Sequence, residues 1–103
     1  MIARIWRGWA ATPENADAYA EFLARTFLPA AGRIPGFAGV QVLRRQVGNE
    51  IEFVTITRFD SLDAIKAFAG EDYEAANVAP RARELLNRFD ARCEHFELVF
   101  QMP

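Results

Sequence analysis

The stretch Thr57–Gly70, TRFDSLDAIKAFAG, decides the fold of this chain because it joins a strand directly to a capped helix. Phe59 ends a run of alternating side chains, which is the pattern of a strand. Asp60 and Ser61 are both good helix N-caps, since a short side-chain oxygen can accept a hydrogen bond from the first helical turn. Gly70 suits the left-handed position that ends a helix. The stretch therefore predicts a strand that turns at once into a helix.

This turn also fixes two aromatic side chains. Phe59 is the last residue of the predicted strand, and Phe68 lies roughly two turns into the helix that follows it. We expect a pocket to form beside these two rings.

Length and composition are those of an ordinary globular protein. The 103 residues predict one domain over 1–103, and 51% of them are hydrophobic and 25% charged. Nine Phe, two Trp and two Tyr are many aromatic residues for this length, and they suit a core, an interface or a pocket lining.

Composition argues against several classes of partner. The net charge is −2 and no basic run stands out, so we expect no nucleic acid partner. One cysteine and one histidine offer no cluster of metal ligands, so we expect no metal. No apolar run approaches the roughly 18 residues of a membrane span. The N-terminus lacks the apolar core of a signal peptide, so the expected location is the cytoplasm.

Alternation, helical spacing and turn residues mark the other elements. Thr12 caps a helix that Pro29 should kink or end, and Gly48-Asn49 forms a hairpin turn. The expected strands cover 1–10, 37–47, 51–59 and 92–100. The expected helices begin at Thr12, Ser61 and Pro80, the last of them reaching Phe89, and a short helical piece covers 71–77.

The element order is β-α-β-β-α-β, which is the ferredoxin-like order with an antiparallel four-stranded sheet. The expected fold class is therefore α+β. Helices in this order cover one face of the sheet, yet each predicted strand carries bulky apolar groups on both faces. A second sheet from an identical chain is the simplest cover for the other face. We therefore expect a homodimer whose two sheets form one barrel.

With this order in place, the chain resembles the dimeric α+β barrel superfamily, and within it the antibiotic biosynthesis monooxygenase family. The resemblance covers nearly the whole chain. It rests on the length, the element order, the turn Ile34-Pro35-Gly36-Phe37, and Phe59-Asp60-Ser61-Leu62-Asp63-Ala64 leading to Phe68. The last segment is similar to the aromatic-x-Ser-x-x-Ala pattern of the family. Its members include cofactor-free oxygenases of polycyclic phenols, haem-degrading enzymes and quorum-signal processing proteins.

The resemblance places a site at the end of the third strand. Polyketide-oxidising members use an Asn on this strand, a Trp at its end and a Tyr on the following helix. The matching positions here are Thr55, Phe59 and Ile65. Phe59 keeps the aromatic surface and Thr55 can donate one hydrogen bond, whereas Ile65 can donate none.

Haem-degrading members of the family use a different set of residues. They carry an Asn on the first strand, a Trp on the helix after the third strand, and a His ligand in the next helical piece. The matching positions here are Trp6 or Arg7, Phe68 and Asn77. Because the histidine ligand is missing, the sequence disfavours haem degradation.

His95 and Arg7 are the candidate catalytic residues. His95, the only histidine, could take a phenolic proton near neutral pH. In the structural alternative Phe96, Leu98 and Phe100 face the helices, and His95 faces the barrel interior or the dimer seam. Arg7 has an alternative as well: the arginines on the predicted strands, Arg4, Arg7, Arg45 and Arg58, either bind an anionic phenolate or carboxylate or pair with Glu52 or Glu97.

The candidate substrate-binding residues are aromatic or hydrogen-bonding side chains expected near the pocket: Trp6, Trp9, Thr55, Phe59, Phe68, Tyr73 and Asn77. Packing in a core or an interface is the alternative for both tryptophans. Tyr73 and Asn77 are four residues apart in the short helical piece, so they should share a face over the pocket.

The family resemblance implies a cofactor-independent monooxygenase that acts on an aromatic or polyketide-like small molecule. In such chemistry the substrate carbanion reduces dioxygen itself, so no cofactor is expected, and the protein supplies position and electrostatics. One alternative is a small-molecule-binding or isomerase-like barrel with the same pocket and no oxygen chemistry. Another is a haem protein, whose axial ligand only His95 or a tyrosine could supply.

Overall fold

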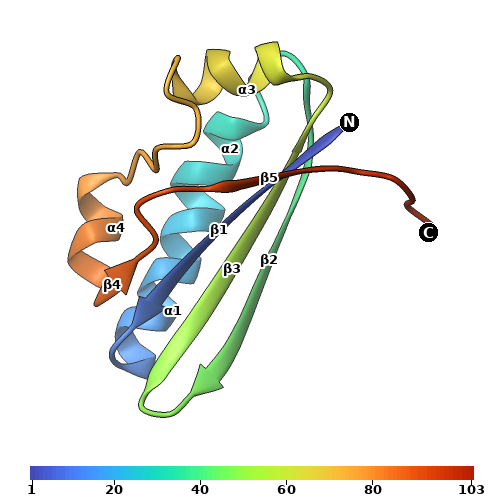
Figure 1. The fold of residues 1–103 in the computed structure, drawn as a ribbon. Helices are drawn as coiled ribbons and strands as arrows, with labels where there is room; N and C mark the ends of the chain where they lie inside the picture. Colours follow the sequence, from blue (N-terminus) through green and yellow to red (C-terminus); the bar gives the residue numbers. More distant parts are fainter.

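An antiparallel sheet carries every helix on one of its faces (Figure 1). The computed structural model describes all residues, 1–103. The strand order is β2-β3-β1, and β4 and β5 both pair with the free edge of β1. In chain order the elements are β1 (Ile2–Ala10), α1 (Pro13–Phe22), the π-helical turn η1 (Leu23–Phe27), α2 (Leu28–Ala31), β2 (Phe37–Val47), β3 (Glu50–Phe59), α3 (Leu62–Ala69), α4 (Pro80–Leu85), β4 (Arg88–Phe89) and β5 (Glu94–Glu97).

The predicted ferredoxin-like fold is confirmed, and the stretch that decides it behaves as expected. Ser61 caps α3, because its hydroxyl accepts a hydrogen bond from the Ala64 amide at 3.1 Å. Gly70 follows the helix with a φ of 93°. Gly36, in the turn before β2, has a φ of 87°, and a Cβ there would lie 2.6 Å from the Ala64 Cβ. Glycine therefore lets the turn lie directly against α3.

The sheet has five strands rather than the predicted four. The helix that begins at Pro80 ends at Leu85 instead of reaching Phe89, because Leu86 takes an extended conformation. The Asn87 amide then donates to the Trp9 carbonyl, and the next two residues pair with β1 as β4. The last strand is also shorter than predicted, since only Glu94–Glu97 pairs with β1.

The predicted helical piece over 71–77 is wrong. This segment forms turns, and Ala75 makes an isolated bridge with Arg92. Its backbone groups bond outside the segment: the Cys93 amide donates to the Glu74 carbonyl and the Ala76 amide to the Ala91 carbonyl. Long-range partners therefore replace the local hydrogen bonds that a helix would need.

The first helical region continues through Pro29 and ends at Ala31, before Gly32. Pro29 therefore does not end the helix as predicted, and a π-helical turn precedes it. The Leu28 amide donates to the Leu23 carbonyl, five residues back. Proline has no amide hydrogen and crowds the preceding turn, and the wider turn relieves both problems.

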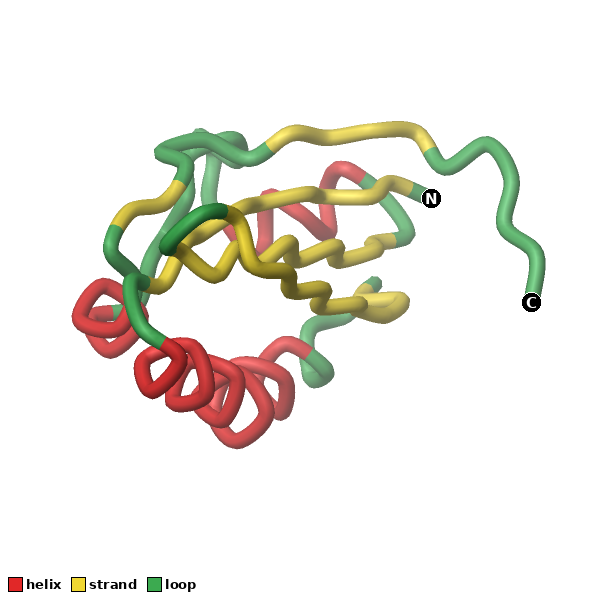
Figure 2. Tube along the Cα trace, turned by 90° about the horizontal axis from the view of Figure 1, so that it is seen from below, coloured by secondary structure: helices red, strands yellow, loops and turns green.

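The core between the sheet and the helices has two parts. The larger cluster joins β1 and β3 to α1 and α4 and consists of Ala10, Ala16, Tyr19, Leu23, Ile51, Phe53, Ala82, Leu85 and Leu86. The smaller cluster joins the end of β3 to α3 and consists of Phe59, Ala64 and Ile65. Both clusters lie on the same side of the sheet, because Ile51, Phe53 and Phe59 occupy alternate positions of β3 and share one face. Figure 2 shows α1, α2 and α4 on one side of the strands.

No helix covers the other face of the sheet. The strand register places Ile5 beside Ile56 there and Val54 beside Leu43, and Leu43 is 52% exposed. We call the two sides of the sheet the covered face and the open face. The open face carries the apolar side chains that the sequence predicted for both sides of each strand.

The chain ends in a segment that leaves the body of the structure (Figure 1). Its apolar side chains Val99, Phe100 and Met102 are 73–87% exposed. None of the helices is both long and apolar enough to pass through a bilayer.

Candidate functional site

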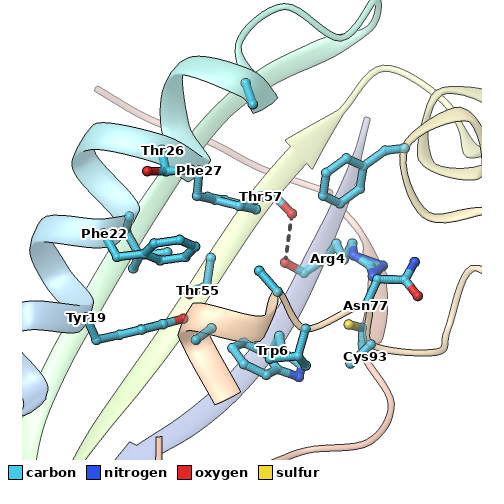
Figure 3. Close-up of a pocket in the computed structure, with 17 residues that line it drawn as sticks. Arg4, Trp6, Tyr19, Phe22, Thr26, Phe27, Thr55, Thr57, Asn77 and Cys93 are labelled. Carbon is cyan, nitrogen blue, oxygen red and sulfur yellow. Dashed lines mark hydrogen bonds between the residues drawn. The ribbon is translucent and has the colours of Figure 1, made fainter. Parts of the chain in front are cut away.

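A cavity of about 350 Å³ lies between the covered face of the sheet and the helices (Figure 3). This volume is near the lower end of the roughly 300–1,000 Å³ of small-molecule sites. Most of its lining is apolar. The lining residues are Arg4, Trp6, Tyr19, Phe22, Leu23, Thr26, Phe27, Ala30, Thr55, Thr57, Phe68, Ala76, Asn77, Val78, Ala79, Ala82 and Cys93.

One wall of the cavity comes from α1, η1 and α2. Thr12 caps α1 by accepting a hydrogen bond from the Asn15 amide at 3.1 Å, as the sequence predicted. From there the inward side chains follow at helical spacing, and Tyr19 and Ala30 stand at the two ends of the wall. The π-helical turn lies between them, in a position that is common for functional sites in helices.

Aromatic rings enclose one end of the cavity. Phe68 of α3 lies 6.3 Å from Phe27 between ring centroids, in an edge-on arrangement. Behind Phe68 lies Phe59, with 5.5 Å between the centroids. Phe27 and Phe68 therefore offer an aromatic surface to a planar ligand, and Phe59 supports the Phe68 ring from behind.

Arg4 is the only charged side chain that lines the cavity. It is 6% exposed and forms no salt bridge; its Nη1 donates to the Tyr73 carbonyl at 2.9 Å. The guanidinium carbon lies 5.5 Å from the centroid of Phe68. Burial lowers the pKa of Arg4 from its usual value, with a smaller opposing effect from Cys93. A buried cation without a carboxylate is rare in proteins, so Arg4 is suited to bind an anion.

Hydroxyl groups supply most of the other polar atoms. Thr57 donates to the Arg4 carbonyl at 3.4 Å. Thr55, two residues earlier on the same face of β3, has a buried hydroxyl with no partner. Burial raises the pKa of Tyr19 to about 12, and the neighbouring Thr55 side chain opposes part of this rise. Tyr19 is therefore a neutral hydroxyl at any physiological pH.

The remaining side of the cavity is formed by the segment after α3 and by the chain before β5. The Asn77 side-chain amide donates to the Ala69 carbonyl at 2.9 Å, which ties this segment to the end of α3. The Cys93 thiol lies near Arg4 (Figure 3). Burial raises the pKa of Cys93 more than Arg4 lowers it, so the thiol stays protonated near neutral pH.

Four of the predicted substrate-binding residues line this cavity: Trp6, Thr55, Phe68 and Asn77. Three others do not. Phe59 is fully buried in the smaller core cluster, and Trp9 packs under the Arg88 guanidinium with 3.9 Å to the ring centroid. Tyr73 contributes its carbonyl to Arg4, while its ring meets His95 edge-on with 5.1 Å between centroids.

Neither predicted catalytic residue lines the cavity. Arg7 lies on the open face, where it pairs with Glu94 at 3.0 Å and approaches Glu52 at 3.9 Å. Arg45 pairs with the same Glu52, so ion pairing, the alternative for these arginines, is what the structure contains. A catalytic role for Arg7 stays a prediction, and its position separates it from the cavity by the thickness of the sheet.

The predicted faces of the last strand are wrong. His95 pairs with Arg4 across the strands and lies on the covered face, behind Tyr73, with both ring nitrogens buried and unpartnered. Burial lowers its pKa, with a smaller contribution from Arg4 in the same direction. Phe96 points to the open face and is 50% exposed. The Tyr73 ring packs against His95 on the covered side, and the alternation of the strand then directs Phe96 to the open face.

Three polar lining residues are not among the predicted site residues: Arg4, Tyr19 and Thr57. Tyr19 belongs to an amphipathic stripe, which reads as plain core. The strands nevertheless carry a signal for the site. Arg4, Thr55 and Thr57 are polar, and the alternation of the strands places all three on the face opposite the open face. Polar residues on the face that helices cover indicate a cavity rather than a packed core.

Comparison with known proteins identifies the family. The model of the family described as antibiotic biosynthesis monooxygenase matches residues 1–79. The chain therefore belongs to this family, and the predicted resemblance is confirmed. A comparison with curated protein sequences found no match.

Solved structures share the fold over the full length of the chain. MhuD, a haem degrader from Mycobacterium tuberculosis with two haems bound in its active site, is similar with a TM-score of 0.68 and 21% identity, over 100% of each chain. SnoaB, a cofactor-independent oxygenase from Streptomyces nogalater, is similar with a TM-score of 0.57 and 19% identity, over 99% of this chain and 96% of its own. At this level of identity the likeness shows the fold alone.

Proposed function

We propose that this protein is a cofactor-independent monooxygenase whose substrate is an aromatic molecule bound as a phenolate or enolate. The observation that carries the proposal is the buried guanidinium of Arg4, which lacks a carboxylate and is the only charged group in a mostly apolar cavity. An anionic oxygen in that cavity would replace the water that a buried cation loses. Membership of the monooxygenase family and likeness to a cofactor-independent oxygenase support the choice of reaction.

Arg4 would promote the reaction by stabilising the ionised substrate. The lining contains no Asp, Glu or His, so the substrate proton leaves to solvent or to a basic group outside the lining. A cation in a low-dielectric cavity lowers the pKa of a bound phenol or enol, which reduces the need for a strong base. The predicted base His95 lies behind Tyr73 and stays a prediction for this step.

The electrons for this reaction come from the substrate. In the oxidation of an anthrone-type CH₂ group, the carbanion reduces dioxygen and forms a carbon–oxygen bond. Loss of water from the resulting hydroperoxide leaves a carbonyl, so one oxygen atom enters the product and the other leaves as water with both hydrogens. The chain's own part is to position the ring between Trp6, Phe27 and Phe68 and to exclude bulk water.

A binding or isomerase-like barrel is the second candidate function. The same absence of a carboxylate or imidazole from the lining favours it, because a site that only binds or reorients an anion needs no base. In this case Arg4 keeps its role and dioxygen has none.

The lining residues disfavour a haem-binding role. Haem iron needs an axial ligand, and no histidine lines the cavity. The only thiol and phenol there are Cys93 and Tyr19, and burial raises the pKa of both, which opposes their ionisation to iron ligands. The fold is nevertheless shared with a haem degrader.

We also propose that the protein is a homodimer, as the sequence predicted. The open face leaves Ile5, Leu43 and Phe96 without cover, and an identical sheet would bury them. Sedimentation should give twice the chain mass of 11.6 kDa. Ile56→Asp, in the middle of the open face, should produce monomers, whereas Leu62→Asp on α3 should not. A parent protein that sediments as a monomer would contradict this proposal.

Oxygen consumption tests the function directly. With 1,8-dihydroxyanthrone as substrate, the parent should consume dioxygen faster than buffer does. Arg4→Gln should lower this rate at least ~10-fold, the loss expected for a hydrogen bond to a charged group. Arg81→Gln should keep the parent rate, because this exposed arginine of α4 pairs with Glu84 and does not line the cavity. Thermal unfolding of both variants controls for misfolding.

Each alternative has its own outcome in this experiment. Binding of the anthrone that depends on Arg4, with no acceleration of oxygen uptake, would favour the binding or isomerase-like barrel. A Soret band that appears during haem titration and persists after dialysis of the protein would support a haem-binding role. An Arg4→Gln variant that binds and turns over like the parent would overturn the role given to Arg4.

A further inference from the structure

Thr55 contains a polar atom that the fold leaves unsatisfied. The residue is 7% exposed on the covered face of β3, and its buried hydroxyl has no partner at full hydrogen-bond distance. Only a weak interaction with the Tyr19 hydroxyl reaches it, which lowers the Tyr19 pKa against the larger effect of burial. Thr57 is an internal contrast, since it lies two residues further on the same face and donates to the Arg4 carbonyl. Buried hydroxyls in native proteins nearly always have a partner. Because Thr55 lines the cavity, a bound molecule can supply the one that is missing.

Tyr19 brings a second hydroxyl to the same place from the opposite wall. The residue is 2% exposed, and its ring is held edge-on by Phe53 with 4.9 Å between centroids. Figure 3 shows the Tyr19 oxygen directed from α1 toward the strand that carries Thr55. Its raised pKa, about 12, keeps this hydroxyl protonated and able to donate. The two residues together form a neutral hydrogen-bonding group.

This neutral group is separate from the cation of Arg4. Across the strands Arg4 pairs with Thr57, and Trp6 pairs with Thr55. The two polar positions are therefore offset by two residues, or roughly 7 Å, along the sheet. In Figure 3 the Arg4 side chain lies on the side of the cavity where Asn77 and Cys93 are, whereas Tyr19 belongs to the helical wall. Apolar side chains occupy most of the lining between them.

We propose that the cavity recognises a planar, fused-ring aromatic molecule at two oxygen atoms of different charge: an ionised phenol or enol oxygen at Arg4, and a neutral carbonyl or hydroxyl oxygen at Thr55 and Tyr19. This proposal rests on the proposed function for its anionic part and narrows the substrate class. A ring system with one ionised oxygen only would leave the Thr55 hydroxyl unsatisfied. An uncharged hydrocarbon would satisfy neither group.

Two probes separate the two groups. The first probe, 2-hydroxy-1,4-naphthoquinone, carries an enolate at neutral pH and has carbonyl oxygens on the same ring. The second probe, 2-naphthoate, has fused rings and a negative charge but no further oxygen function. Titration calorimetry at pH 7 compares both probes on the parent protein and on Thr55→Val, Tyr19→Phe and Arg4→Gln. Tyr73→Phe is the matched control, since Tyr73 is the other tyrosine and does not line the cavity.

The parent should bind the naphthoquinone more tightly than the naphthoate. Thr55→Val and Tyr19→Phe should each weaken the naphthoquinone about 5-fold to 10-fold, the effect of one neutral hydrogen bond, and leave the naphthoate unchanged. Arg4→Gln should weaken both probes, and Tyr73→Phe neither. Both hydroxyl variants change few atoms, so either one suffices if the other fails to fold.

The outcomes that overturn the proposal are distinct from those that overturn the proposed function. If Thr55→Val and Tyr19→Phe leave naphthoquinone binding unchanged while Arg4→Gln weakens it, the neutral group is refuted and the anionic group stands. If the hydroxyl variants weaken it and Arg4→Gln does not, the anionic part of the proposed function falls. A parent that binds neither probe refutes both.

Discussion

The two faces of β1 use arginine in opposite ways. Arg7 on the open face shares Glu94 and Glu52 as partners, although its side chain is 37% exposed. Arg4 on the covered face is 6% exposed and has no carboxylate at all. Arg7 thus has carboxylate partners although water could solvate it. Arg4, three positions away on the same strand, has no carboxylate partner although it is buried from water. Folding alone accounts for Arg7, and a ligand is the best account of Arg4.

The prediction with the largest effect tests whether the covered face is a tightly packed core outside the cavity, in contrast to the open face. Phe59→Ala should lower the free energy of unfolding by about 3–5 kcal/mol, because it empties a fully buried site behind Phe68. Denaturant unfolding measures the change. Leu43→Ala on the open face, where half of the side chain is exposed, should cost less than about 1 kcal/mol in the monomer. Equal losses would contradict the distinction between the faces.

The second prediction concerns pH. The folded pKa of Tyr19, about 12, is higher than the usual 10.0, so the folded protein holds this proton more tightly than the unfolded chain does. The contribution of Tyr19 to stability is complete below pH 10 and is lost as pH rises through 12. It amounts to roughly 2–3 kcal/mol. Tyr19→Phe should lose less stability than the parent between pH 10 and 12, as measured by denaturant unfolding. Parallel curves for the two proteins would mean that Tyr19 is not buried as described.

The smallest expected effect bears directly on the two arginines. Arg4→Met should raise the free energy of unfolding of the ligand-free protein by about 1 kcal/mol, since an unpaired buried charge is replaced by an apolar chain and only the bond to the Tyr73 carbonyl is lost. Arg7→Met should lower it by less than about 0.5 kcal/mol, because Glu52 keeps Arg45. Thermal unfolding without ligand measures both changes. A loss of stability in Arg4→Met would show that Arg4 serves the fold.

Local patterns predicted most of the fold. Alternation predicted strands one and three to within one residue at each end, and the caps Thr12 and Ser61 stand where their short side chains suggested. The segment over 71–77 failed because its backbone bonds to residues far along the chain, around Cys93. The same long-range packing reversed the faces of His95 and Phe96, since a short edge strand is oriented by what lies against it.

The candidate site was predictable where the family pattern supplied a position, as for Thr55, Phe68 and Asn77. It was not predictable where packing in the core was already enough to explain the side chain. Tyr19 sits in a helical stripe like any core residue, and only the unpartnered hydroxyl of Thr55 opposite it reveals a further role. Arg7 was preferred to Arg4 because sequence alone does not show which of the two faces the helices cover.

The π-helical turn at Leu23–Phe27 holds one more residue than an α-helical turn, and it lies within the helical wall of the cavity. Tyr19 lies before the turn, in the packing of α1 against α4 and β3, Phe27 lies within the turn and Ala30 follows it. Deleting one residue within the turn would restore ordinary α-helical spacing, and the segments before and after the turn would keep their places. Tyr19 and Ala30 would then stay at the cavity, while the side chains of the turn, Phe27 among them, would shift. A change in chain length by a single residue, rather than a set of substitutions, is thus the shortest route by which this fold could reshape the middle of one cavity wall and preserve both of its ends.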